Sequence, residues 1–304
     1  MVHSLRHRGP DDCGTHIDRA VGLGHARLSI IDLSPTGHQP MHTPDGAYSI
    51  VFNGEVYNFP ELRDRLAAEG VRFRGTSDTE VVLHAFSRFG TKVFAMLNGM
   101  YAMALWDARN ATLHLVRDRF GIKPLYYARI GRGIVFGSEM KSLLVHKSLD
   151  RRINWQAFHE YLYYGNPLRE NTMYAEIREV LPGHFLTISA DSFRDTTYWQ
   201  AEDIQPSDDS LDTATSKVRT LLETSVTDHL ISDVPVGVFL SGGIDSSAIT
   251  ALASKHYRGK LKTYSVGFDF AAEADEIAKA RHVANSSSTS SKTARGKPVS
   301  SLRP

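Results

Sequence analysis

A chain of 304 residues exceeds the usual size of one domain, so its length predicts two domains. Its hydrophobic content of 41% suffices for buried cores, and its formal net charge of +1 argues against attraction of the whole chain to nucleic acid or to a membrane surface. The single cysteine, Cys13, excludes an internal disulfide, and no stretch approaches the length of a membrane span, so we expect a cytoplasmic protein.

From Val21 to about Ser192, short apolar runs alternate with Gly, Pro, Asn and Asp, which is typical of an antiparallel sheet system. Helical patterns interrupt these runs at residues 59–69 and 78–89. Strands beneath helices, in a chain that returns on itself, predict an α+β sandwich. The clearest strand predictions are residues 47–52, 102–107, 112–116, 133–136 and 184–188.

Residues 201–212 are acidic and polar and contain Pro206, which predicts a linker. Beyond it, residues 214–230 predict a helix with one apolar face. Four apolar side chains form that face at spacings of three and four: Val218, Leu221, Leu222 and Val226.

An apolar run at residues 234–240, a helical stretch at 248–256 and a second apolar run at 262–268 follow in order. A buried strand, a helix and a second buried strand predict a β-α-β unit that opens a parallel sheet. A further helix is expected at 274–284. These elements cover only about 80 residues, and a doubly wound sheet usually needs more, so we expect a partial α/β domain.

The most specific motif, S-G-G-I-D-S-S at residues 241–247, joins the first of these strands to its helix. A strand, a glycine turn and a helix N-terminus form an anion site, because unpaired N–H groups and the positive end of the helix converge there. Gly242 and Gly243 let the backbone approach a phosphate, and three serine hydroxyls add donors. Because no lysine follows, the loop suits a pyrophosphate that is bound and then released.

This loop resembles the pyrophosphate loop of the N-type ATP pyrophosphatases. The residues ahead of it resemble the glutaminase half of glutamine-dependent asparagine synthetases, and the resemblance runs from about residue 7 to about residue 284. Its motifs are H-R-G-P-D-D at residues 7–12, A-R-L-S-I-I-D at 26–32, F-N-G-E-V-Y-N at 52–58, T-S-D-T-E at 76–80, R-D-R-F-G-I-K-P-L-Y-Y at 117–127 and F-G-S-E-M-K-S-L at 136–143.

The resemblance implies a four-layer αββα glutaminase of the Ntn-hydrolase type at residues 1–195, without its N-terminal strand. It implies the start of an ATP pyrophosphatase domain, a parallel α/β sheet, at residues 205–284. From Asn285 the chain has seven serines, four basic residues and no acid, so it cannot bury enough apolar area to offset the cost of ordering. We expect residues 285–304 to be a disordered tail outside the family, and favour a frameshift or a fused segment over a regulatory tail.

The resemblance also implies the residues of a glutamine site. Asn53 and Gly54 would stabilise the tetrahedral oxyanion, Arg27 would hold the substrate carboxylate, and Glu55 and Asp78 would accept hydrogen bonds from the ammonium group. Without the resemblance, Arg27 would be a surface strand residue and Asn53-Gly54 an ordinary hairpin turn. Residues 28–31 are expected to form the adjoining strand, so the glutamine-binding set is Arg27, Leu28, Ser29, Ile30, Ile31, Asn53, Gly54, Glu55 and Asp78.

In the resembled glutaminases the nucleophile is an N-terminal cysteine, whose own α-amino group is the base. This chain begins Met1-Val2-His3, so the resemblance implies that the nucleophile is absent. Cys13 cannot replace it, because the nitrogen of an internal cysteine is an amide and is not basic; we expect Cys13 to be a small loop residue.

The resemblance places the β- and γ-phosphates of ATP on residues 241–247. Leu240 and Val266, at the ends of neighbouring strands, would flank the adenosine. Asp245 has two open interpretations, a ligand of Mg²⁺ or a helix cap. The implied ATP-binding residues are Leu240, Ser241, Gly242, Gly243, Ile244, Asp245, Ser246, Ser247 and Val266.

An intact relative would hydrolyse glutamine in its first domain and pass the ammonia to its second, where aspartate is activated as an acyl-adenylate and aminated. The resemblance therefore implies an asparagine synthetase-like protein, truncated at both ends, inactive by itself, with glutamine, ATP, Mg²⁺ and aspartate as its ligands. Its acceptor site would lie beyond the region of resemblance, and a homodimer is left open. Two alternatives remain: a non-catalytic remnant that binds glutamine or ATP, and a related amidotransferase that acts on another carboxylate.

Overall fold

The computed structural model describes residues 1–18, 20–268, 276–287 and 289–296. The chain divides into two compact units, Met1–Pro206 and Ser207–Pro304, called unit 1 and unit 2 below. In the described parts of both units, no helix is long and apolar enough to cross a membrane.

Unit 1 is built on a six-stranded antiparallel sheet in the order β11-β10-β6-β5-β4-β3. Nearly every residue of β5 is buried, because other layers cover both faces of the sheet. Four of the predicted strands lie in this sheet and are confirmed. Its strands are β3 (Met41–His42), β4 (Tyr48–Val56), β5 (Gly99–Asp107), β6 (Thr112–Arg117), β10 (His184–Ile188) and β11 (Phe193–Thr197).

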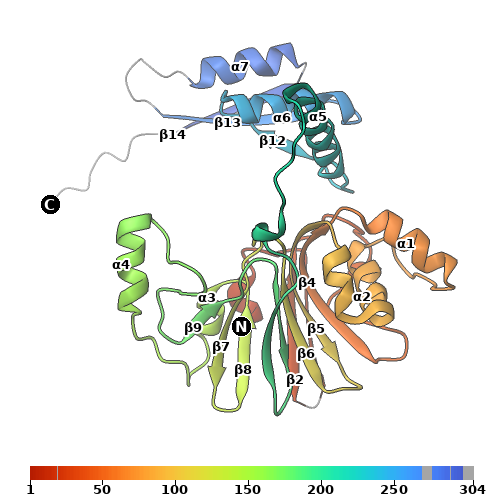
Figure 1. Cartoon of the computed structure of the whole chain (residues 1–304), viewed down its shortest axis with the longest axis vertical. Helices are drawn as coiled ribbons and strands as arrows, with labels where there is room; N and C mark the ends of the chain where they lie inside the picture. The colour runs from red at the N-terminus through yellow and green to blue at the C-terminus, as the bar shows by residue number, and fades with distance from the viewer. Residues whose placement is uncertain (19, 269–275, 288, 297–304) are drawn as a thin grey trace. The chain divides into compact units, whose positions relative to one another are not determined.

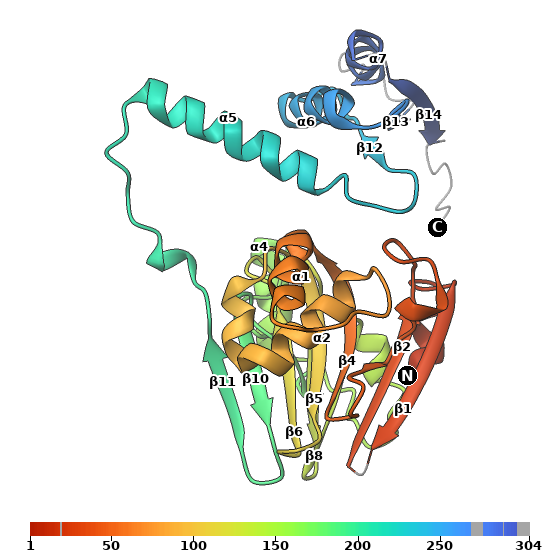
Figure 2. The ribbon, with the colours of Figure 1, turned by 90° about the vertical axis from the view of Figure 1, so that its right-hand side faces the viewer.

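Helices α1 (Phe59–Ala68) and α2 (Asp78–Phe89) cover one face of this sheet, as Figure 2 shows. The side chain of Ser77 accepts a hydrogen bond from the N–H of Glu80 and so caps the start of α2. Gly90, with a φ of 57°, follows its last residue. Both predicted helices are confirmed, and the short helix η3 (Gly90–Met96) follows them.

A second layer of strands covers the other face of the sheet (Figure 1). It consists of an antiparallel hairpin, β1 (Asp12–Asp18) with β2 (Val21–Arg27), and a three-stranded sheet, β8 (Gly133–Gly137), β7 (Tyr126–Ile130) and β9 (Ile177–Glu179). Leu23 and Leu125 from this layer pack against Val51, Ala104 and Leu186 of the large sheet.

Outside the second layer lie α3 (Met140–Leu143) and α4 (Trp155–Tyr164) (Figure 1). Leu143 of α3 is fully buried against Ala128 and Ile177 of the second layer. The order is thus helix, sheet, sheet, helix, and the predicted αββα sandwich is confirmed. Three short helices complete unit 1: η1 (Val2–Leu5), η2 (Pro35–Gly37) and η4 (Ala201–Asp203).

Two local predictions for unit 1 are wrong. Residues 28–31 do not form a strand, because β2 ends at Arg27, whose side chain bonds the carbonyl groups of Ile31 and Asp32 and bends the chain. Cys13 does not lie in a loop: it is an exposed residue of β1, opposite Ala26 of β2.

Unit 2 contains a parallel sheet in the order β12-β13-β14, which confirms the start of a parallel α/β domain. Its cores are small: Val226, Ala253 and Leu261 form one, and Leu240 packs with two alanines of α7 in another. The elements are α5 (Leu211–Asp228), β12 (Gly237–Phe239), α6 (Ile244–His256), β13 (Lys262–Phe268), α7 (Glu276–Ser286) and β14 (Ser290–Gly296).

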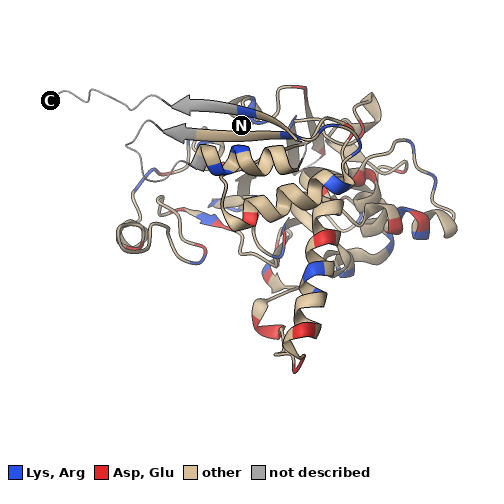
Figure 3. Cartoon of the chain, turned by 90° about the horizontal axis from the view of Figure 1, so that it is seen from above, with Lys and Arg blue, Asp and Glu red and all other residues tan. Residues whose placement is uncertain are grey.

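The expectation of a seven-residue buried strand at residues 234–240 is wrong. The first strand of the unit, β12, has three residues instead of seven, and Phe239 on it is 81% exposed. Helix α5 carries both acidic and basic side chains (Figure 3), and Val218 and Leu221 of the predicted apolar face are exposed. The predicted helix is confirmed, and of the four apolar side chains on its face only Val226 belongs to a buried core.

The prediction of a disordered tail from Asn285 is wrong up to Gly296. Helix α7 continues to Ser286, and β14 then pairs in parallel with β13 over seven positions. The composition of this segment excludes a large apolar core, but an edge strand needs only its main-chain N–H and C=O groups. The remainder of that prediction, residues 288 and 297–304, lies outside the described residues.

Candidate functional site

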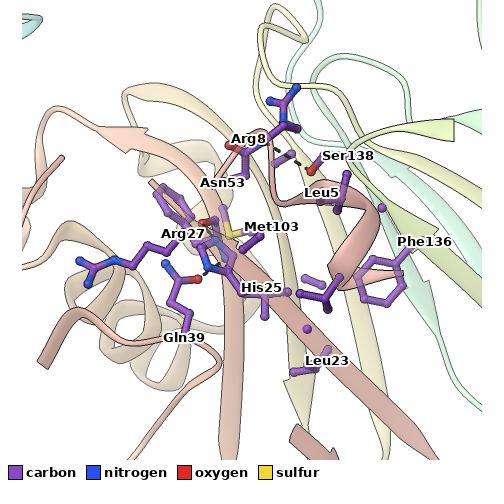
Figure 4. Close-up of a pocket in the computed structure, with 18 of the residues that line it drawn as sticks. Leu5, Arg8, Leu23, His25, Arg27, Gln39, Asn53, Met103, Phe136 and Ser138 are labelled. Carbon is purple, nitrogen blue, oxygen red and sulfur yellow. Dashed lines mark hydrogen bonds between the residues drawn. The ribbon is translucent and has the colours of Figure 1, made fainter. Parts of the chain in front are cut away.

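Unit 1 contains a cavity of about 850 Å³ between its two strand layers. Its wall includes residues from β2, β4, β5, α2 and β8, and Figure 4 shows several of them around the opening. All the predicted glutamine-binding residues except Ser29 line it; the N–H of Ser29 instead donates to the carboxylate of Asp11 at 2.8 Å. The lining members of the predicted set are Arg27, Leu28, Ile30, Ile31, Asn53, Gly54, Glu55 and Asp78.

Asn53 and Gly54 lie inside β4, opposite Ala102 and Tyr101 of β5, so the alternative of a hairpin turn is wrong. The amide nitrogen of Asn53 donates to the hydroxyl of Ser138 at 3.5 Å, which places that amide at the end of β8. A Cβ on residue 54 would lie 2.1 Å from the carbonyl oxygen of Met100, so only glycine fits.

The direction of the Gly54 N–H follows from its neighbours on β4. The N–H of Phe52 donates to the side chain of Gln39 at 2.7 Å, and the N–H of Val56 donates to Asp78 at 3.0 Å. Both therefore point away from β5. Because N–H groups two residues apart on a strand point the same way, the N–H of Gly54 also points away from β5, on the side of the cavity.

Asp78, the first residue of α2, is almost fully buried. Its carboxylate accepts hydrogen bonds from the N–H groups of Val56 at 3.0 Å and Thr79 at 2.7 Å. Burial nevertheless raises the pKa of Asp78 to about 6, and the negative charge of Glu55 acts in the same direction. A cation placed beside these two carboxylates would offset both effects.

Arg27 is also buried, so its interpretation as a surface residue is wrong. Its guanidinium donates to the carbonyl oxygens of Ile31, Asp32 and Ser34, which uses three of its five N–H donors. A Cβ on Gly37 would lie 2.0 Å from this group, so the loop after β2 wraps closely around it. In Figure 4 the side chain points away from Leu23, toward this loop.

His25 and Gln39 are among the polar cavity residues that sequence reasoning missed. The Nε2 of His25 donates to the carbonyl oxygen of Phe52 at 2.9 Å, and Gln39 accepts from the N–H of the same residue. Burial lowers the pKa of His25 to about 4, so its ring is neutral at pH 7. Its buried Nδ1 has no hydrogen-bond partner among the described residues. The signal was its place on β2, two residues before Arg27 on a strand of period two.

In unit 2, the motif at residues 241–247 lies between β12 and α6 as predicted, but the helix begins at Ile244 and so includes the last four residues of the motif. The hydroxyl groups of Ser241 and Ser246 lie 3.0 Å apart, and Ser246 donates to the carbonyl of Gly243 at 3.2 Å. Gly242 has a φ of 80°, which favours glycine. A Cβ on Gly243 would meet only the Ser241 hydroxyl, at an ordinary 3.5 Å, so the space in front of the helix is open.

The N-cap of α6 is Gly243, and Asp245 lies in the first turn, so the interpretation of Asp245 as the cap is wrong. Among the residues that the structure describes, no group of three His, Cys, Asp or Glu could hold a metal ion, and Asp245 would contribute a single carboxylate. Leu240 is fully buried against Ala280 and Ala284, so its side chain cannot flank a ligand. Val266, in contrast, is 54% exposed.

The family model described as "Glutamine amidotransferase domain" matches residues 1–199, and the one described as "Asparagine synthase" matches residues 217–295. The second match therefore continues into the segment that we expected to lie outside the family. Over 276 residues the chain is 40% identical to glutamine-hydrolyzing asparagine synthetase 3 of Bacillus subtilis, covering 88% of this chain and 45% of that protein.

Over 272 residues it is 42% identical to glutamine-hydrolyzing asparagine synthetase 1 of Bacillus subtilis, covering 88% of this chain and 42% of that protein. Over 313 residues it is 37% identical to amidase chyE of Penicillium rubens, covering 94% of this chain and 45% of that protein. The chain thus spans about half the length of the curated relatives it matches. Because the first family model matches about two thirds of the chain, the chain belongs to the family of the glutamine amidotransferase domain.

Proposed function

We propose that unit 1 is the glutamine-binding half of an asparagine synthetase and that its cavity holds the substrate amide during hydrolysis. One observation carries the proposal: Arg27, Asn53, Gly54, Glu55 and Asp78, from three separate motifs, line a single cavity. In that cavity, the side-chain amide of Asn53 and the main-chain N–H of Gly54 can stabilise an oxyanion. The carboxylates of Glu55 and Asp78 can bind an ammonium group.

The oxyanion role follows from the direction of the donors. Asn53 supplies a side-chain N–H, and Gly54 supplies a main-chain N–H that points away from β5. Both donors belong to a strand that is fixed by its ladder with β5, so little reorganisation is needed when negative charge develops on the substrate oxygen.

The charged end of glutamine would bind deeper among the ionisable residues. Its ammonium group would lie near Asp78 and Glu55, where its charge offsets the cost of burying Asp78. Its carboxylate would take the two N–H donors of Arg27 that the loop carbonyls leave over. These assignments keep the site residues that the sequence implied, with Ser29 as a member of the supporting loop.

In unit 2, we propose that residues 241–247 bind the pyrophosphate part of ATP. The open space beside Gly243 and the hydroxyl groups around it fit phosphate oxygens at a helix N-terminus. Asp245 alone suits Mg²⁺ that is already held by phosphates, because Mg²⁺ commonly binds one or two carboxylates and completes its shell with phosphate and water. We also propose that aspartate is the acceptor, that the protein forms a homodimer and that it is cytoplasmic.

A second candidate is an amidotransferase for another carboxylate, which the similarity to an amidase of Penicillium rubens favours. The two candidates share the glutamine cavity and differ only in the acceptor. Supplying aspartate or other carboxylates to a chain that includes the complete second domain, and measuring the amidated product, would separate them.

The glutamine site can be tested by binding alone. Isothermal titration calorimetry with L-glutamine should give binding that weakens about tenfold in Glu55→Gln, because one acceptor of the ammonium group loses its charge. Glu61→Gln is the matched control: Glu61 is an exposed residue of α1 outside the cavity, and its change should leave the affinity as it was. Equal affinities for both variants, or no binding to the unchanged chain, would contradict the proposed site.

A further inference from the structure

Unit 1 contains a second, smaller cavity of about 470 Å³, called the edge cavity below, which shares no lining residue with the glutamine cavity. Its walls come from β7, β9 and β11 and from the residues just before β9. Because β9 and β11 are edge strands of their sheets, the cavity lies at an edge of the sandwich. Sites for small molecules usually have volumes of about 300–1,000 Å³. Six residues line the edge cavity: Tyr127, Arg129, Ala175, Glu176, Arg178 and Phe193.

Three polar side chains of the edge cavity come from one face of the β8-β7-β9 sheet. Tyr127 and Arg129 are two residues apart on β7, and side chains two apart on a strand point to the same face. Arg178 of β9 is paired directly with Tyr127, so its side chain lies on that face too. Tyr127 and Phe193 both pack against the core between the two strand layers, and their ring centroids lie 5.8 Å apart. The two rings therefore form an apolar wall beside the charged groups.

The side chain of Arg129 is held by an aromatic ring and not by an acid. Its guanidinium carbon lies 4.0 Å from the centroid of the Phe193 ring. This contact uses the flat face of the guanidinium, whereas its five N–H donors lie in its plane. Among the described residues, no carbonyl or carboxylate oxygen accepts a hydrogen bond from these donors. The guanidinium is thus oriented in advance, and its donors are open to a ligand.

The other charged residues that line the edge cavity have partners of opposite charge. Arg178 pairs with Glu170 at 3.1 Å, and Glu176 pairs with Arg152 at 3.6 Å. Arg129 has no such partner in the described part of the chain, so the edge cavity has an excess of one positive charge. A ligand with a single negative charge would balance it.

The hydroxyl of Tyr127 offers a further donor. Burial raises the pKa of Tyr127, so its hydroxyl keeps its proton at neutral pH. The nearby carboxylate of Asp195 acts in the same direction, but it accepts a hydrogen bond from the Nδ1 of His184 at 2.8 Å. Within the ranges that the structure describes, the hydroxyl of Tyr127 has no hydrogen-bond partner. A ligand in the edge cavity can therefore accept hydrogen bonds from both Tyr127 and Arg129.

We propose that the edge cavity binds a small-molecule carboxylate that carries an aromatic ring. Both oxygens of the carboxylate accept hydrogen bonds from the in-plane donors of Arg129, and the hydroxyl of Tyr127 adds one more. The ring of the ligand contacts the rings of Tyr127 and Phe193 and extends the apolar wall. A carboxylate fits better than a phosphate, because a dianion would leave one negative charge without a partner in the cavity. The site is separate from the glutamine cavity and does not depend on the function proposed for it.

Three probe molecules separate the contribution of the ring from that of the charge. Naphthoate carries both, naphthamide carries the ring without the charge, and acetate carries the charge without the ring. Each is titrated into the purified chain, and its dissociation constant is measured by NMR spectroscopy. Naphthoate should bind with a dissociation constant of about 1 mM or lower, and the two other probes should bind at least about tenfold more weakly.

Variants of the protein locate the binding. Arg129→Met removes the charge of an exposed side chain and should weaken naphthoate binding at least about tenfold. Arg129→Lys keeps the charge but loses the planar set of donors, so its affinity should lie between those of Arg129→Met and the unchanged chain. Tyr127→Phe keeps the ring and should weaken binding about threefold, because one hydrogen bond is lost.

Arg194→Met is the matched control. Arg194 is an exposed residue of β11 that follows Phe193 directly and does not line the edge cavity. Successive side chains on a strand point to opposite faces, so this change should leave the affinity for naphthoate as it was. Equal losses in Arg129→Met and Arg194→Met would overturn the proposal, because they would indicate attraction to surface charge in general.

Three other results would also overturn the proposal: no binding of naphthoate, equal binding of naphthamide, or unchanged affinity of Arg129→Met. The position of the bound probe is read from the NMR signals of the backbone amides. Shifts on adding naphthoate that are confined to β7, β9 and β11 would support the edge cavity. Shifts of β2 and β4 instead would place the probe in the glutamine cavity and would contradict the assignment.

Discussion

The carboxylate of Asp78 accepts the main-chain N–H of Val56 at 3.0 Å, which ties the first turn of α2 to the end of β4. This bond crosses from one layer of the sandwich to the next and places a buried charge at the wall of the cavity. The raised pKa of Asp78, about 6, makes this contact sensitive to mild acid.

The first prediction concerns the pH dependence of stability. The folded protein keeps the proton of Asp78 up to about pH 6, whereas the unfolded chain releases it near pH 3.8. The folded state therefore binds more protons between these values, and the free energy of unfolding decreases as the pH rises through this window. The decrease that Asp78 contributes should reach about 3 kcal/mol, measured by urea denaturation of unit 1 at several pH values.

Asp78→Asn is the variant that isolates this effect. An asparagine oxygen can still accept one of the two N–H bonds, so below pH 4 the variant should be about 1–3 kcal/mol less stable than the unchanged protein. The variant should lack the decrease between pH 4 and 6, so this deficit should disappear as the pH rises through the window. Subtracting the two curves of unfolding free energy against pH removes the contributions of the other carboxylates, which are the same in both proteins. Parallel curves for the two proteins would show that Asp78 has an ordinary pKa.

The second prediction concerns Gly54. A Cβ at this position would lie 2.1 Å from the main-chain oxygen of Met100, and the ladder with β5 leaves neither strand free to move. Gly54→Ala should therefore lower the free energy of unfolding by about 3 kcal/mol. Gly46→Ala is the control: Gly46 also has a positive φ, 69°, but open space around it, so the cost should be about 1 kcal/mol. Similar losses for both variants would mean that backbone strain outweighs the close approach at β5.

Helix α2 and the polar residues of the cavity differ in how well the sequence predicts them. The apolar face of α2 is a local signal, and it predicts the helix with its observed bounds. Asn53 and Asp78 were found through motif resemblance, which also gave the cavity its chemistry. His25 was missed because its role is to satisfy the backbone of Phe52, a contact 27 residues away that exists only after folding.

Strand β14 is an element that sequence composition did not predict. Composition predicts whether a segment can bury apolar area, and it predicts that residues 285–296 can bury little. Composition does not report main-chain pairing, however, and β13 offered a free parallel edge over residues 262–268. Helix α5 shows a similar limit. The periodicity of its apolar residues predicts a helix, but it does not predict whether another element covers Val218 and Leu221, which are exposed.

The third prediction tests whether β14 contributes to the stability of unit 2. The N–H of Ser290 donates to the carbonyl oxygen of Leu261 at 2.9 Å, at the start of the pairing with β13. Ser290→Pro removes this donor and should lower the free energy of unfolding of unit 2 by about 1–3 kcal/mol. Ser290→Ala keeps the N–H and should change stability little. Equal melting temperatures for both variants would support the original expectation of a disordered tail.

The last prediction concerns Gly243 and the phosphates. A side chain at this position would meet only the hydroxyl of Ser241, at 3.5 Å, and the residue is the N-cap of α6 with an extended backbone that any residue can adopt. Gly243→Val should therefore leave the folded state of unit 2 almost unchanged, while its side chain fills the space in front of the helix N-terminus. Pyrophosphate and ATP should bind at least about tenfold more weakly to this variant by calorimetry.

Two comparisons make that result specific to the loop. Ser216→Ala, on the exposed surface of α5, should bind both ligands as the unchanged chain does. AMP should bind more weakly than pyrophosphate to every form, because the loop offers donors to phosphate oxygens, whereas the side chain of Leu240 is buried and leaves Val266 alone for the adenosine. Preference for AMP, or equal affinity of Gly243→Val and the unchanged chain for pyrophosphate, would mean that residues 241–247 are a structural turn between β12 and α6.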